Sequence, residues 1–396
     1  MYNFLIIKRI VENVFIFPFI LLGKIIAYFN PLEKEYRIFF CFPFYHTGGA
    51  ENVHAQITQT TGSSDCIIFF TRKSIDKRFL FQFQNSNCKI LDISKFTDHK
   101  EFYFLNLIFR GIVSGYINKQ KEKPIVFNGQ CNFGYKISPW IKKNIAQIEL
   151  IHSLNSFSFI RIPFLPFITK TIMISKKRIE DHQQLYFEKG IPAKFFERII
   201  YIPNGISISE TEKTKSSNSF TVLYSGRGSK EKRIYLLGQI AKELQKTNKD
   251  IQFVFMGDVS EFIAEVEFPF IKFLGNLNDE KSINEQYVNA AILLLTSDTE
   301  GFPMVVMEAM AKGCAIVATP VGDVQLHIIN SENGFLFTSI KDEKQIVKEA
   351  VLFIEKLYNE RNLLHQISIN NIKYANTNFG LEKFQNSYRT LFASLK

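Results

Sequence analysis

The chain has 396 residues, of which 46% are hydrophobic and 22% are charged. That share of apolar side chains excludes an intrinsically disordered chain, and the length suffices for two domains of ordinary size. The five cysteines are widely spaced and form no CxxC pair, which argues against a disulfide framework and against a zinc site. They are Cys41, Cys66, Cys88, Cys131 and Cys314. We therefore expect a reducing cytosol, with each cysteine a small buried apolar residue.

The net charge of +10 is concentrated in the first half of the chain. Residues 1–195 carry 26 Lys and Arg against 14 Asp and Glu, whereas residues 196–396 carry 22 against 24. A basic surface of this kind attracts anionic lipid head groups, phosphates or nucleic acid. Because the sequence contains no RNA- or DNA-binding motif, we expect an anionic membrane surface and no nucleic acid as a partner.

The first predicted segment is strongly apolar. Residues 4–29 are interrupted by Lys8, Arg9, Glu12 and Lys24, and the unbroken run 14–23 contains a proline. This run is shorter than the about 20 apolar residues that a membrane-spanning helix needs. No small-x-small cleavage site follows it, which argues against a removed signal peptide. We predict an interfacial helix or a re-entrant anchor, with a helix packed on the protein core and an uncleaved spanning anchor as the alternatives.

From Tyr36 onward, short apolar strands alternate with longer helical segments. In the first half, helices are predicted at 50–60 and 103–119, and strands at 37–41, 66–70, 88–91, 125–128, 148–151 and 171–174. A second series of strands follows at 220–224, 251–256, 271–274, 291–295, 315–318 and 334–337. A polar stretch with a Pro-Asn-Gly turn, Ile202 to Lys215, is the predicted linker. This alternation indicates two parallel sheets, each covered by helices, and ligands of such sheets bind beyond the carboxyl ends of the strands.

The segment Thr296 to Thr319 combines a strand end, a loop and a helix start. The helix is predicted from Met304 to Lys312 and ends at a glycine, and two carboxylates, Glu300 and Glu308, lie eight residues apart. Free N–H groups at a helix N-terminus favour an anionic ligand, and carboxylates accept hydrogen bonds from hydroxyl groups. A ligand with phosphates and many hydroxyls is a nucleotide sugar. A hydrolase with paired acids is the competing interpretation.

Three further motifs follow predicted strand ends. Gly48 and Gly49 lie after the first strand and His152 after the strand 148–151, while the sequence YSGRGSKEKR places Arg227 and Lys232 five residues apart. Taken singly, two glycines more often make a simple turn, a histidine is more often structural, and a basic run is usually a solvated face. Together, the basic pair can bind a diphosphate, for which a hydrolase has no use.

These motifs, in this order and spacing, resemble the retaining glycosyltransferases of family four, which have the GT-B fold. The resemblance covers roughly residues 37–390 and implies an α/β protein with two Rossmann-like parallel-sheet domains facing each other across a cleft. The family usually has glycine after the motif lysine, and this chain has Arg233 there. The expected divisions are a membrane-associating segment at 1–35, an acceptor-binding domain at 36–200, a donor-binding domain at 201–380 and a returning helix at 381–396.

The resemblance also implies a role for individual residues. Glu308 is expected to bind the ribose hydroxyls, Glu300 to face the donor sugar, and His152 to contact the transferred sugar. The residues expected to act in catalysis are His152, Arg227, Lys232 and Glu300. The residues expected to bind the donor are Gly48, Gly49, Gly226, Arg227, Lys232, Gly257, Asn276, Leu277, Gly301, Phe302, Pro303, Met304, Val305 and Glu308.

The implied function is transfer of a sugar from a UDP- or GDP-sugar to a glycan or lipid-linked acceptor, with retention of configuration, in the synthesis of a cell-surface polysaccharide such as lipopolysaccharide or capsule. No cofactor beyond the donor and no catalytic metal is expected, and the enzyme is expected on the cytoplasmic face of the membrane. The alternatives are another GT-B enzyme, such as a nucleotide-sugar epimerase or a phosphorylase, and a non-catalytic partner subunit. The sequence leaves open the base, the sugar, the acceptor and the oligomeric state.

Overall fold

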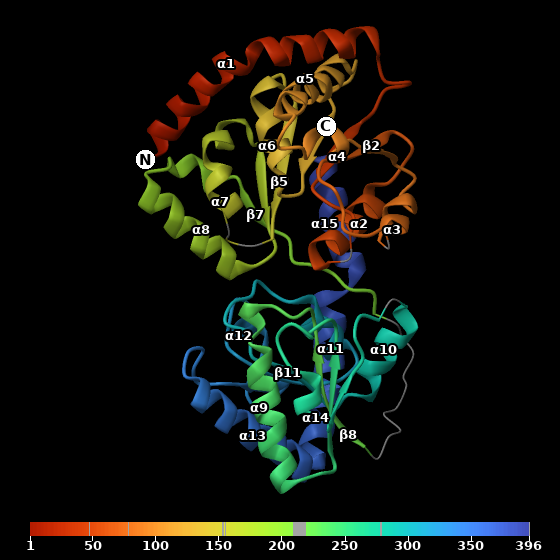
Figure 1. Ribbon diagram of the computed structural model, residues 1–396, viewed down its shortest axis with the longest axis vertical. Helices are drawn as coiled ribbons and strands as arrows, with labels where there is room; N and C mark the ends of the chain where they lie inside the picture. The colour runs from red at the N-terminus through yellow and green to blue at the C-terminus, as the bar shows by residue number, and fades with distance from the viewer. Residues whose placement is uncertain are drawn as a thin grey trace. The chain divides into compact units, whose positions relative to one another are not determined.

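The structure is a computed structural model that describes residues 1–46, 48–77, 79–152, 154, 156–208, 219–277 and 279–395, with only the backbone of residues 156 and 157. The chain divides into two compact units, Met1–Pro203 with Glu382–Lys396 (unit 1) and Asn204–Leu381 (unit 2) (Figure 1). The predicted linker, Ile202 to Lys215, lies outside the described residues from residue 209 onward.

Unit 1 is built on a parallel sheet that has, in the described part of the chain, seven strands in the order β3-β2-β1-β4-β5-β6-β7. The strands are β1 (Ile38–Phe42), β2 (Cys66–Phe70), β3 (Lys89–Asp92), β4 (Ile125–Asn128), β5 (Ala146–Ile151), β6 (Lys170–Met173) and β7 (Ile199–Tyr201). The helices are α1 (Tyr2–Phe29), α2 (Gly49–Thr61), α3 (Leu80–Gln84), α4 (Ser94–Thr97), α5 (Tyr103–Lys119), α6 (Asn132–Ile137), α7 (Ser156–Ile160), α8 (Lys176–Lys189) and α15 (Leu381–Ala393). The six predicted strands are present, and the edge strand β7 was not predicted.

Unit 2 repeats this design with strands in the order β10-β9-β8-β11-β12-β13, again all parallel. The strands are β8 (Phe220–Ser225), β9 (Ile251–Met256), β10 (Ile271–Phe273), β11 (Ile292–Leu295), β12 (Ala315–Ala318) and β13 (Gly334–Leu336). The helices are α9 (Ile234–Thr247), α10 (Glu280–Asn289), α11 (Met304–Ala311), α12 (Val324–His327), α13 (Glu343–Asn359) and α14 (Arg361–Phe379). The predicted fold class, two Rossmann-like domains with parallel sheets, is therefore confirmed.

The core of each unit follows from the composition of its central strands. All residues of β1 and of β8 are buried and most of them are apolar, because helices cover both faces of a parallel sheet. Each strand order reverses direction at one point, between β1 and β4 in unit 1 and between β8 and β11 in unit 2. The loops that leave these strands diverge at this switch point, which is where sheets of this kind bind ligands.

The apolar N-terminal segment forms one continuous helix, α1, which passes through Pro18. It packs on α5, and its buried residues are Ile20, Gly23 and Ala27. Among the described residues, α1 is the helix that is long and apolar enough to cross a membrane by length and composition, with a mean hydropathy of 2.0 over 18 residues, of which 17% are buried. The expectation that its apolar run is too short to span was therefore wrong on length, because the run continues through the isolated charges.

Candidate functional site

In unit 2, the loops after β8 and β9 are held together by backbone hydrogen bonds. The N–H of Gly226 donates to the carbonyl of Met256 at 2.9 Å, and the N–H of Gly228 donates to that of Asp258 at 2.6 Å. Gly257 has φ +121°, and a Cβ added there would lie 2.0 Å from the carbonyl oxygen of Gly226. Only glycine fits this close crossing. The glycines at 226 and 257 therefore allow the two strand ends to meet.

An ion pair joins the β8 loop to the β11 loop at the switch point of unit 2. The ammonium of Lys232 contacts Oε1 of Glu300, and the exposed fractions of the two side chains are 18% and 12%. The carboxylate holds a long, flexible side chain at a fixed place beside the loop that leads into α11. Two of the predicted catalytic residues, 68 positions apart in the chain, are thus direct partners.

Arg233, the departure from the family pattern, has a clear structural role. Its φ of +50° lies in the left-handed region, where glycine is the favoured residue. Its buried guanidinium compensates by donating hydrogen bonds to the carbonyls of Thr296 at 2.6 Å, Ser297 at 3.2 Å and Ile340 at 2.6 Å. In return, the hydroxyl of Thr296 donates to the carbonyl of Lys232 at 3.0 Å. Arg233 therefore fixes the backbone that carries Lys232 against the loop that carries Glu300.

Glu308 lies on α11 and is partly buried, and this burial raises the pKa of its carboxyl. The hydroxyl of Tyr287, from α10, donates a hydrogen bond to Oε2 of Glu308 at 2.7 Å. The hydroxyl oxygen of Tyr287 also lies 2.9 Å from that of Ser225, at the end of β8. Because the phenol proton is given to the carboxylate, Ser225 must be the donor in the second bond. Three elements thus orient one carboxylate.

The loop from Gly301 to Val305 sets the start of α11, with Pro303 as the residue before the helix and Met304 as its first residue. The side chain of Phe302 is buried and stacks on His327, with ring centroids 4.2 Å apart. Phe302 therefore anchors the loop to the core, and a ligand can meet only its backbone. The helix begins directly after this proline, which has no N–H group and at this position removes no hydrogen bond from within the helix.

Other predicted donor residues lie at neighbouring strand ends. The side-chain oxygen of Asn276 accepts a hydrogen bond from the N–H of Asp258 at 3.2 Å, which connects the loops after β9 and β10. Leu277 is partly buried, and Arg227 is exposed. The structure thus brings Lys232 to Glu300, and it does not bring Arg227 into this pair.

In unit 1, His152 follows β5 and forms a pair with a second histidine. Its Nε2 lies 3.0 Å from Nε2 of His54, which belongs to α2 and stacks on Phe42 with centroids 4.3 Å apart. Its backbone N–H donates to the side-chain oxygen of Gln130 at 3.1 Å. Burial lowers the pKa of His152 to about 4, so the ring is neutral at physiological pH.

The environment of His54 indicates the tautomers of this pair. Nδ1 of His54 is buried and has no hydrogen-bond partner among the described residues. A buried N–H without a partner is rare, so we place the proton of His54 on Nε2, from where it is donated to His152. Nε2 of His152 is then an acceptor, and its own proton is on Nδ1. His152 consequently offers a hydrogen-bond donor at Nδ1.

Gly48 and Gly49 lie at the start of α2, which begins at Gly49 and not at Ala50 as predicted. A Cβ at position 48 would lie 2.2 Å from Oε2 of Glu51, whereas a Cβ at position 49 would have no atom within 4 Å. Gly48 therefore allows the carboxylate of Glu51 to fold back over the helix start. These residues and His152 belong to unit 1, and all other predicted site residues belong to unit 2.

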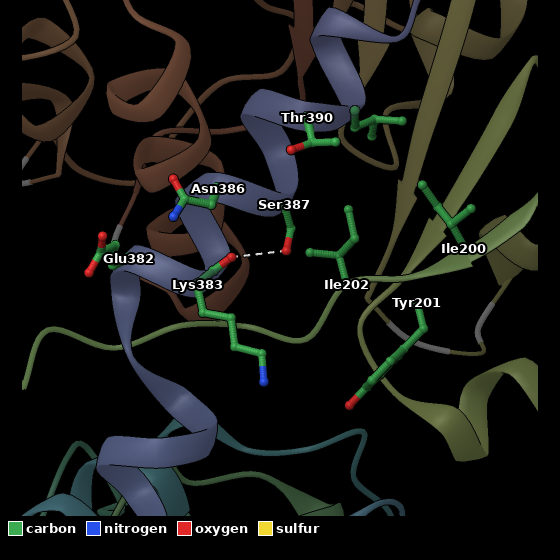
Figure 2. A pocket seen from close by; sticks show the side chains of 9 residues that line it. Ile200, Tyr201, Ile202, Glu382, Lys383, Asn386, Ser387 and Thr390 are labelled. Carbon is green, nitrogen blue, oxygen red and sulfur yellow. Dashed lines mark hydrogen bonds between the residues drawn. The ribbon is translucent and has the colours of Figure 1, made fainter.

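Unit 1 also contains a pocket of about 670 Å³ between β7 and the start of α15 (Figure 2). Its apolar side comes from β7 and the residue after it, Ile200 and Ile202, and from Leu391 of α15. Its polar lining consists of Tyr201, Glu382, Lys383, Asn386, Ser387 and Thr390. The pocket contains none of the residues that the sequence predicted for catalysis or donor binding. It is a separate place in unit 1 where a ligand with hydroxyl groups could be bound.

Comparison with known proteins identifies the part of the chain that holds most of these residues. Residues 207–374 match the family model described as glycosyl transferases group 1. This segment belongs to the group 1 glycosyl transferases. The predicted family is therefore confirmed, and the Lys232, Glu300 and Glu308 side chains lie inside the matched segment.

Curated relatives match the chain over part of their own length. The chain is 28% identical over 177 residues to the "UDP-N-acetylglucosamine--peptide N-acetylglucosaminyltransferase GtfA subunit" of Streptococcus pneumoniae, which covers 42% of this chain and 34% of that protein. It is 22% identical over 259 residues to the "Lipopolysaccharide 1,2-N-acetylglucosaminetransferase" of Salmonella typhimurium, and this match covers 59% of this chain and 64% of that protein. The chain thus spans about a third of the first of these relatives and under two thirds of the second.

Among solved structures, the fold is similar to that of Anabaena HepE in complex with UDP-glucose. The TM-score is 0.71 at 17% identity, and the match covers 90% of this chain and 99% of that one. At this identity the likeness establishes the shared fold.

Sequence reasoning missed three residues that position predicted site residues, namely His54 in unit 1 and Tyr287 and Arg233 in unit 2. Tyr287 and His54 looked like ordinary helix residues, since nothing local shows that each contacts a predicted site residue from another element. Arg233 was noticed only as a departure from the family. An arginine at a position that calls for a left-handed backbone is a signal that could have been followed.

Proposed function

We propose that the protein is a glycosyltransferase that moves a sugar from a nucleotide-sugar donor to a glycan or lipid-linked acceptor. The observation that carries this proposal is the placement of Lys232, Glu300 and Glu308 around the switch point of unit 2, inside the group 1 segment. A diphosphate needs a cation and N–H donors, and a ribose needs an acceptor for two hydroxyls. Lys232, the first turn of α11 and Glu308 supply these groups.

The proposed chemistry is electrostatic stabilisation of the leaving group. As the bond between sugar and diphosphate breaks, negative charge grows on the phosphate oxygens, and Lys232 with the N-terminus of α11 offsets it. Arg227 is exposed and can reach outward to the same phosphates. Glu300 then has two tasks, to hold the Lys232 ammonium and to face the donor sugar. His152 contributes a neutral N–H donor for a hydroxyl of that sugar.

For the donor we propose a UDP-sugar, with UDP-N-acetylglucosamine as the first to test. The support comes from the relatives, two of which are named for transfer of N-acetylglucosamine, and from the UDP-glucose complex of the similar structure. A GDP-sugar is the competing donor, since contacts from backbone groups discriminate weakly between bases. We also propose that configuration is retained and that catalysis needs no metal, so that activity survives EDTA.

Donor binding is tested by thermal unfolding of the full chain with UDP-N-acetylglucosamine, UDP-glucose and GDP-mannose. A ligand that binds only the folded state raises the melting temperature. We expect a shift with one nucleotide class that is lost in Glu308→Gln and kept in Glu332→Gln, an exposed glutamate of the same unit. If no nucleotide sugar shifts the transition, and neither variant changes transfer or hydrolysis of any donor, the proposal fails.

For the acceptor we propose the pocket between β7 and α15 as a place that binds hydroxyl groups. Asn386 and Ser387 line it and lie outside the donor unit. We expect Asn386→Ala to raise the KM for a glycan acceptor and to leave the donor-induced thermal shift unchanged. An unchanged acceptor KM would remove the pocket from the proposal and leave the donor site intact.

Two alternatives give different products. A phosphorylase would release the sugar as a sugar phosphate, and an epimerase would interconvert donors without an acceptor, so product analysis separates both from a transferase. A non-catalytic subunit is the other candidate, and it is worth testing because the streptococcal relative is named as a subunit. We place the protein in the cytoplasm, on the inner face of the membrane, which agrees with five buried cysteines that form no disulfide.

A further inference from the structure

Helix α1 presents a long apolar surface that no described residue covers. Phe15 is 76% exposed, Val14 69% and Phe4 68%. The other large apolar residues of α1 that are exposed are Ile7, Ile10, Val11, Phe17, Phe19, Leu21, Leu22, Ile25, Tyr28 and Phe29. Side chains of this size each favour an apolar environment strongly, so a continuous row of them requires a partner.

Three of the four charged residues of the same helix contact the protein. The guanidinium of Arg9 donates to the carbonyl of Pro163, and the ammonium of Lys136 lies 2.8 Å from Oε1 of Glu12. Lys24 is partly buried and lies 5.9 Å from the centroid of the Trp140 ring. Of the four charges on α1, Lys8 is the exposed one. This arrangement is the reverse of an ordinary surface helix, whose charges face water.

A close helix crossing holds α1 in this orientation. Gly23 and Ala27 of α1 meet Gly111 and Gly115 of α5, so both helices offer small residues four positions apart. A Cβ on Gly23 would lie 2.0 Å from the carbonyl oxygen of Ile108, and the ideal Cβ of Gly115 would lie 2.9 Å from Cβ of Ala27. Backbones that approach this closely pack along a fixed seam. Figure 1 shows α1 running along the outer side of unit 1, beside α5.

Basic and aromatic residues border the apolar surface. The Lys119 ammonium lies 4.3 Å from the centroid of the Tyr28 ring and donates to the carbonyl of Tyr28 at 3.1 Å. Trp140 contacts Phe17, with ring centroids 6.3 Å apart, and the exposed Lys142 and Lys143 follow it in the chain. Trp and Tyr rings favour the level of lipid head groups, and each lysine near an anionic membrane adds to binding.

We propose that α1 is an in-plane membrane anchor, which lies docked on unit 1 and sinks its outward face into the surface of an anionic phospholipid bilayer. The apolar row enters the boundary between head groups and acyl chains, and the bordering lysines contact the phosphates. A hollow of about 350 Å³ between α1 and Trp140, lined by Ile10, Val14 and Phe17 among others, provides an apolar recess on the same surface.

Two other occupants agree less well with these contacts. A spanning α1 would carry Arg9 and Glu12 into hydrocarbon after breaking their contacts with Pro163 and Lys136, which is costly for charged groups. A second copy of the chain would bring two identical surfaces with the same basic border together, and like charges would repel. An anionic bilayer satisfies the apolar row and the lysines at once.

The first test measures sedimentation of the full chain with vesicles. We expect binding to vesicles of equal parts phosphatidylcholine and phosphatidylglycerol, and clearly weaker binding to phosphatidylcholine alone or in high salt. The double variant Val14→Ser, Phe15→Ser is expected to weaken binding about tenfold or more. The matched control, Val266→Ser with Phe187→Ser, removes two other exposed apolar side chains and should bind like the wild type. Equal binding of the first variant and the wild type would overturn the proposal.

The second test separates an in-plane helix from a spanning one. The five native cysteines are buried thiols outside any disulfide, so they give little reaction with a charged maleimide. We introduce Asn3→Cys or Asn30→Cys, at exposed positions near the two ends of α1, and add the reagent outside the vesicles. Both cysteines should react. Protection of one end by the vesicle would show a spanning helix and would overturn the proposal. A wild-type dimer that binds no lipid and is lost in Val14→Ser, Phe15→Ser would show self-association and would overturn it as well.

Discussion

Arg233 combines a strained backbone with three buried hydrogen bonds, and two substitutions separate these effects. Both Arg233→Ala and Arg233→Gly remove the guanidinium. Alanine keeps a Cβ and so keeps the backbone strain at φ +50°, whereas glycine adopts this φ without strain. Hydrogen bonds from a charged group contribute about 1.5–3 kcal/mol each, so both variants should be less stable. We expect Arg233→Gly to be the more stable of the two by about 1 kcal/mol. Urea unfolding measures this order, and equal stability would show that the backbone is not strained.

Glu308 illustrates how a buried carboxylate lowers stability. Burial raises the pKa of its carboxyl in the folded chain above the ordinary 4.5. The contribution of such a group to stability is complete below pH 4.5 and is lost as pH rises through the folded pKa. We therefore expect Glu308→Gln to raise the melting temperature at pH 7 in the absence of donor, with no difference at pH 4. The same variant should bind the donor about tenfold more weakly, because a neutral amide is a weaker acceptor for hydroxyl groups.

Tyr287→Phe is the companion variant, because it leaves Glu308 in place and removes the hydroxyl that donates to it. That hydrogen bond lowers the pKa of Glu308, so its loss should raise the pKa further. As the pH is lowered, Glu308 should therefore become protonated earlier in Tyr287→Phe, and donor affinity should begin to fall at a higher pH than in the wild type. An identical pH profile would mean that Tyr287 does not orient the carboxylate.

The histidine pair makes a prediction about acid stability. Because the pKa of His152 falls from 6.5 to about 4 on burial, the unfolded chain binds more protons between these values, and roughly 2–4 kcal/mol of stability is lost as pH falls from 6.5 to 4. His54→Phe keeps the ring stack on Phe42 and removes one buried histidine, so the loss should be smaller. His365→Phe, an exposed histidine of unit 2, should behave like the wild type.

The variant His54→Phe also tests the proposed tautomer. In the wild type, nitrogen chemical shifts should show the proton of His152 on Nδ1. In His54→Phe, the proton of His152 should be found on both ring nitrogens. The fold decrease in kcat should then exceed the fold change in the KM for the donor. A proton on Nε2 of His152 in the wild type would contradict the assignment.

At the scale of residues, the sequence predicted the side chains of the candidate site and could not predict which distant residues they contact. Lys232, Glu300 and Glu308 lie in motifs with a fixed local spacing, so their types and order could be read directly. Arg233 reaches Thr296 across 63 positions and His54 reaches His152 across 98, and such pairings depend on the strand order. Only the fold brings them together.

At the scale of elements, strands buried on both faces were predictable because most of their residues are apolar. β7 escaped notice because it has three residues, all partly buried, at the edge of its sheet. For α1 the sequence predicted apolar character and left the packing open. The seam with α5 depends on Gly111 and Gly115, which in the sequence are two ordinary small residues in a predicted helix.

The α1–α5 seam gives a prediction for a whole element. In Gly111→Ala, the new Cβ would lie 2.2 Å from the carbonyl oxygen of Ile20, so the helices must separate. We expect a loss of about 1–3 kcal/mol and faster trypsin cleavage after the basic residues of α1. Gly380→Ala, where the nearest atom lies 3.6 Å away, is the matched control and should be cut at the wild-type rate. Unchanged cleavage of α1 in Gly111→Ala would contradict the seam.

At the scale of the whole molecule, the two units differ in how the chain builds them. Unit 2 is one continuous segment, 204–381, with its own core, whereas unit 1 needs the distant α15. Phe392 of α15 packs against Phe40 and Phe127 of the unit 1 sheet, and Tyr388 is fully buried. Removing α15 exposes these core rings to water.

Separate expression tests this difference. We expect residues 204–381 to fold cooperatively and to show the donor-induced rise in melting temperature without transferring sugar, since His152 is absent. Residues 1–203 should expose apolar surface and aggregate, and a version with 382–396 joined to it by a flexible linker should be soluble. Circular dichroism and thermal unfolding measure both outcomes. Loss of buried aromatic contacts destabilises a core, so 1–203 alone should be less stable than the joined form. Equal stability of the two would show that α15 is not part of the core of unit 1.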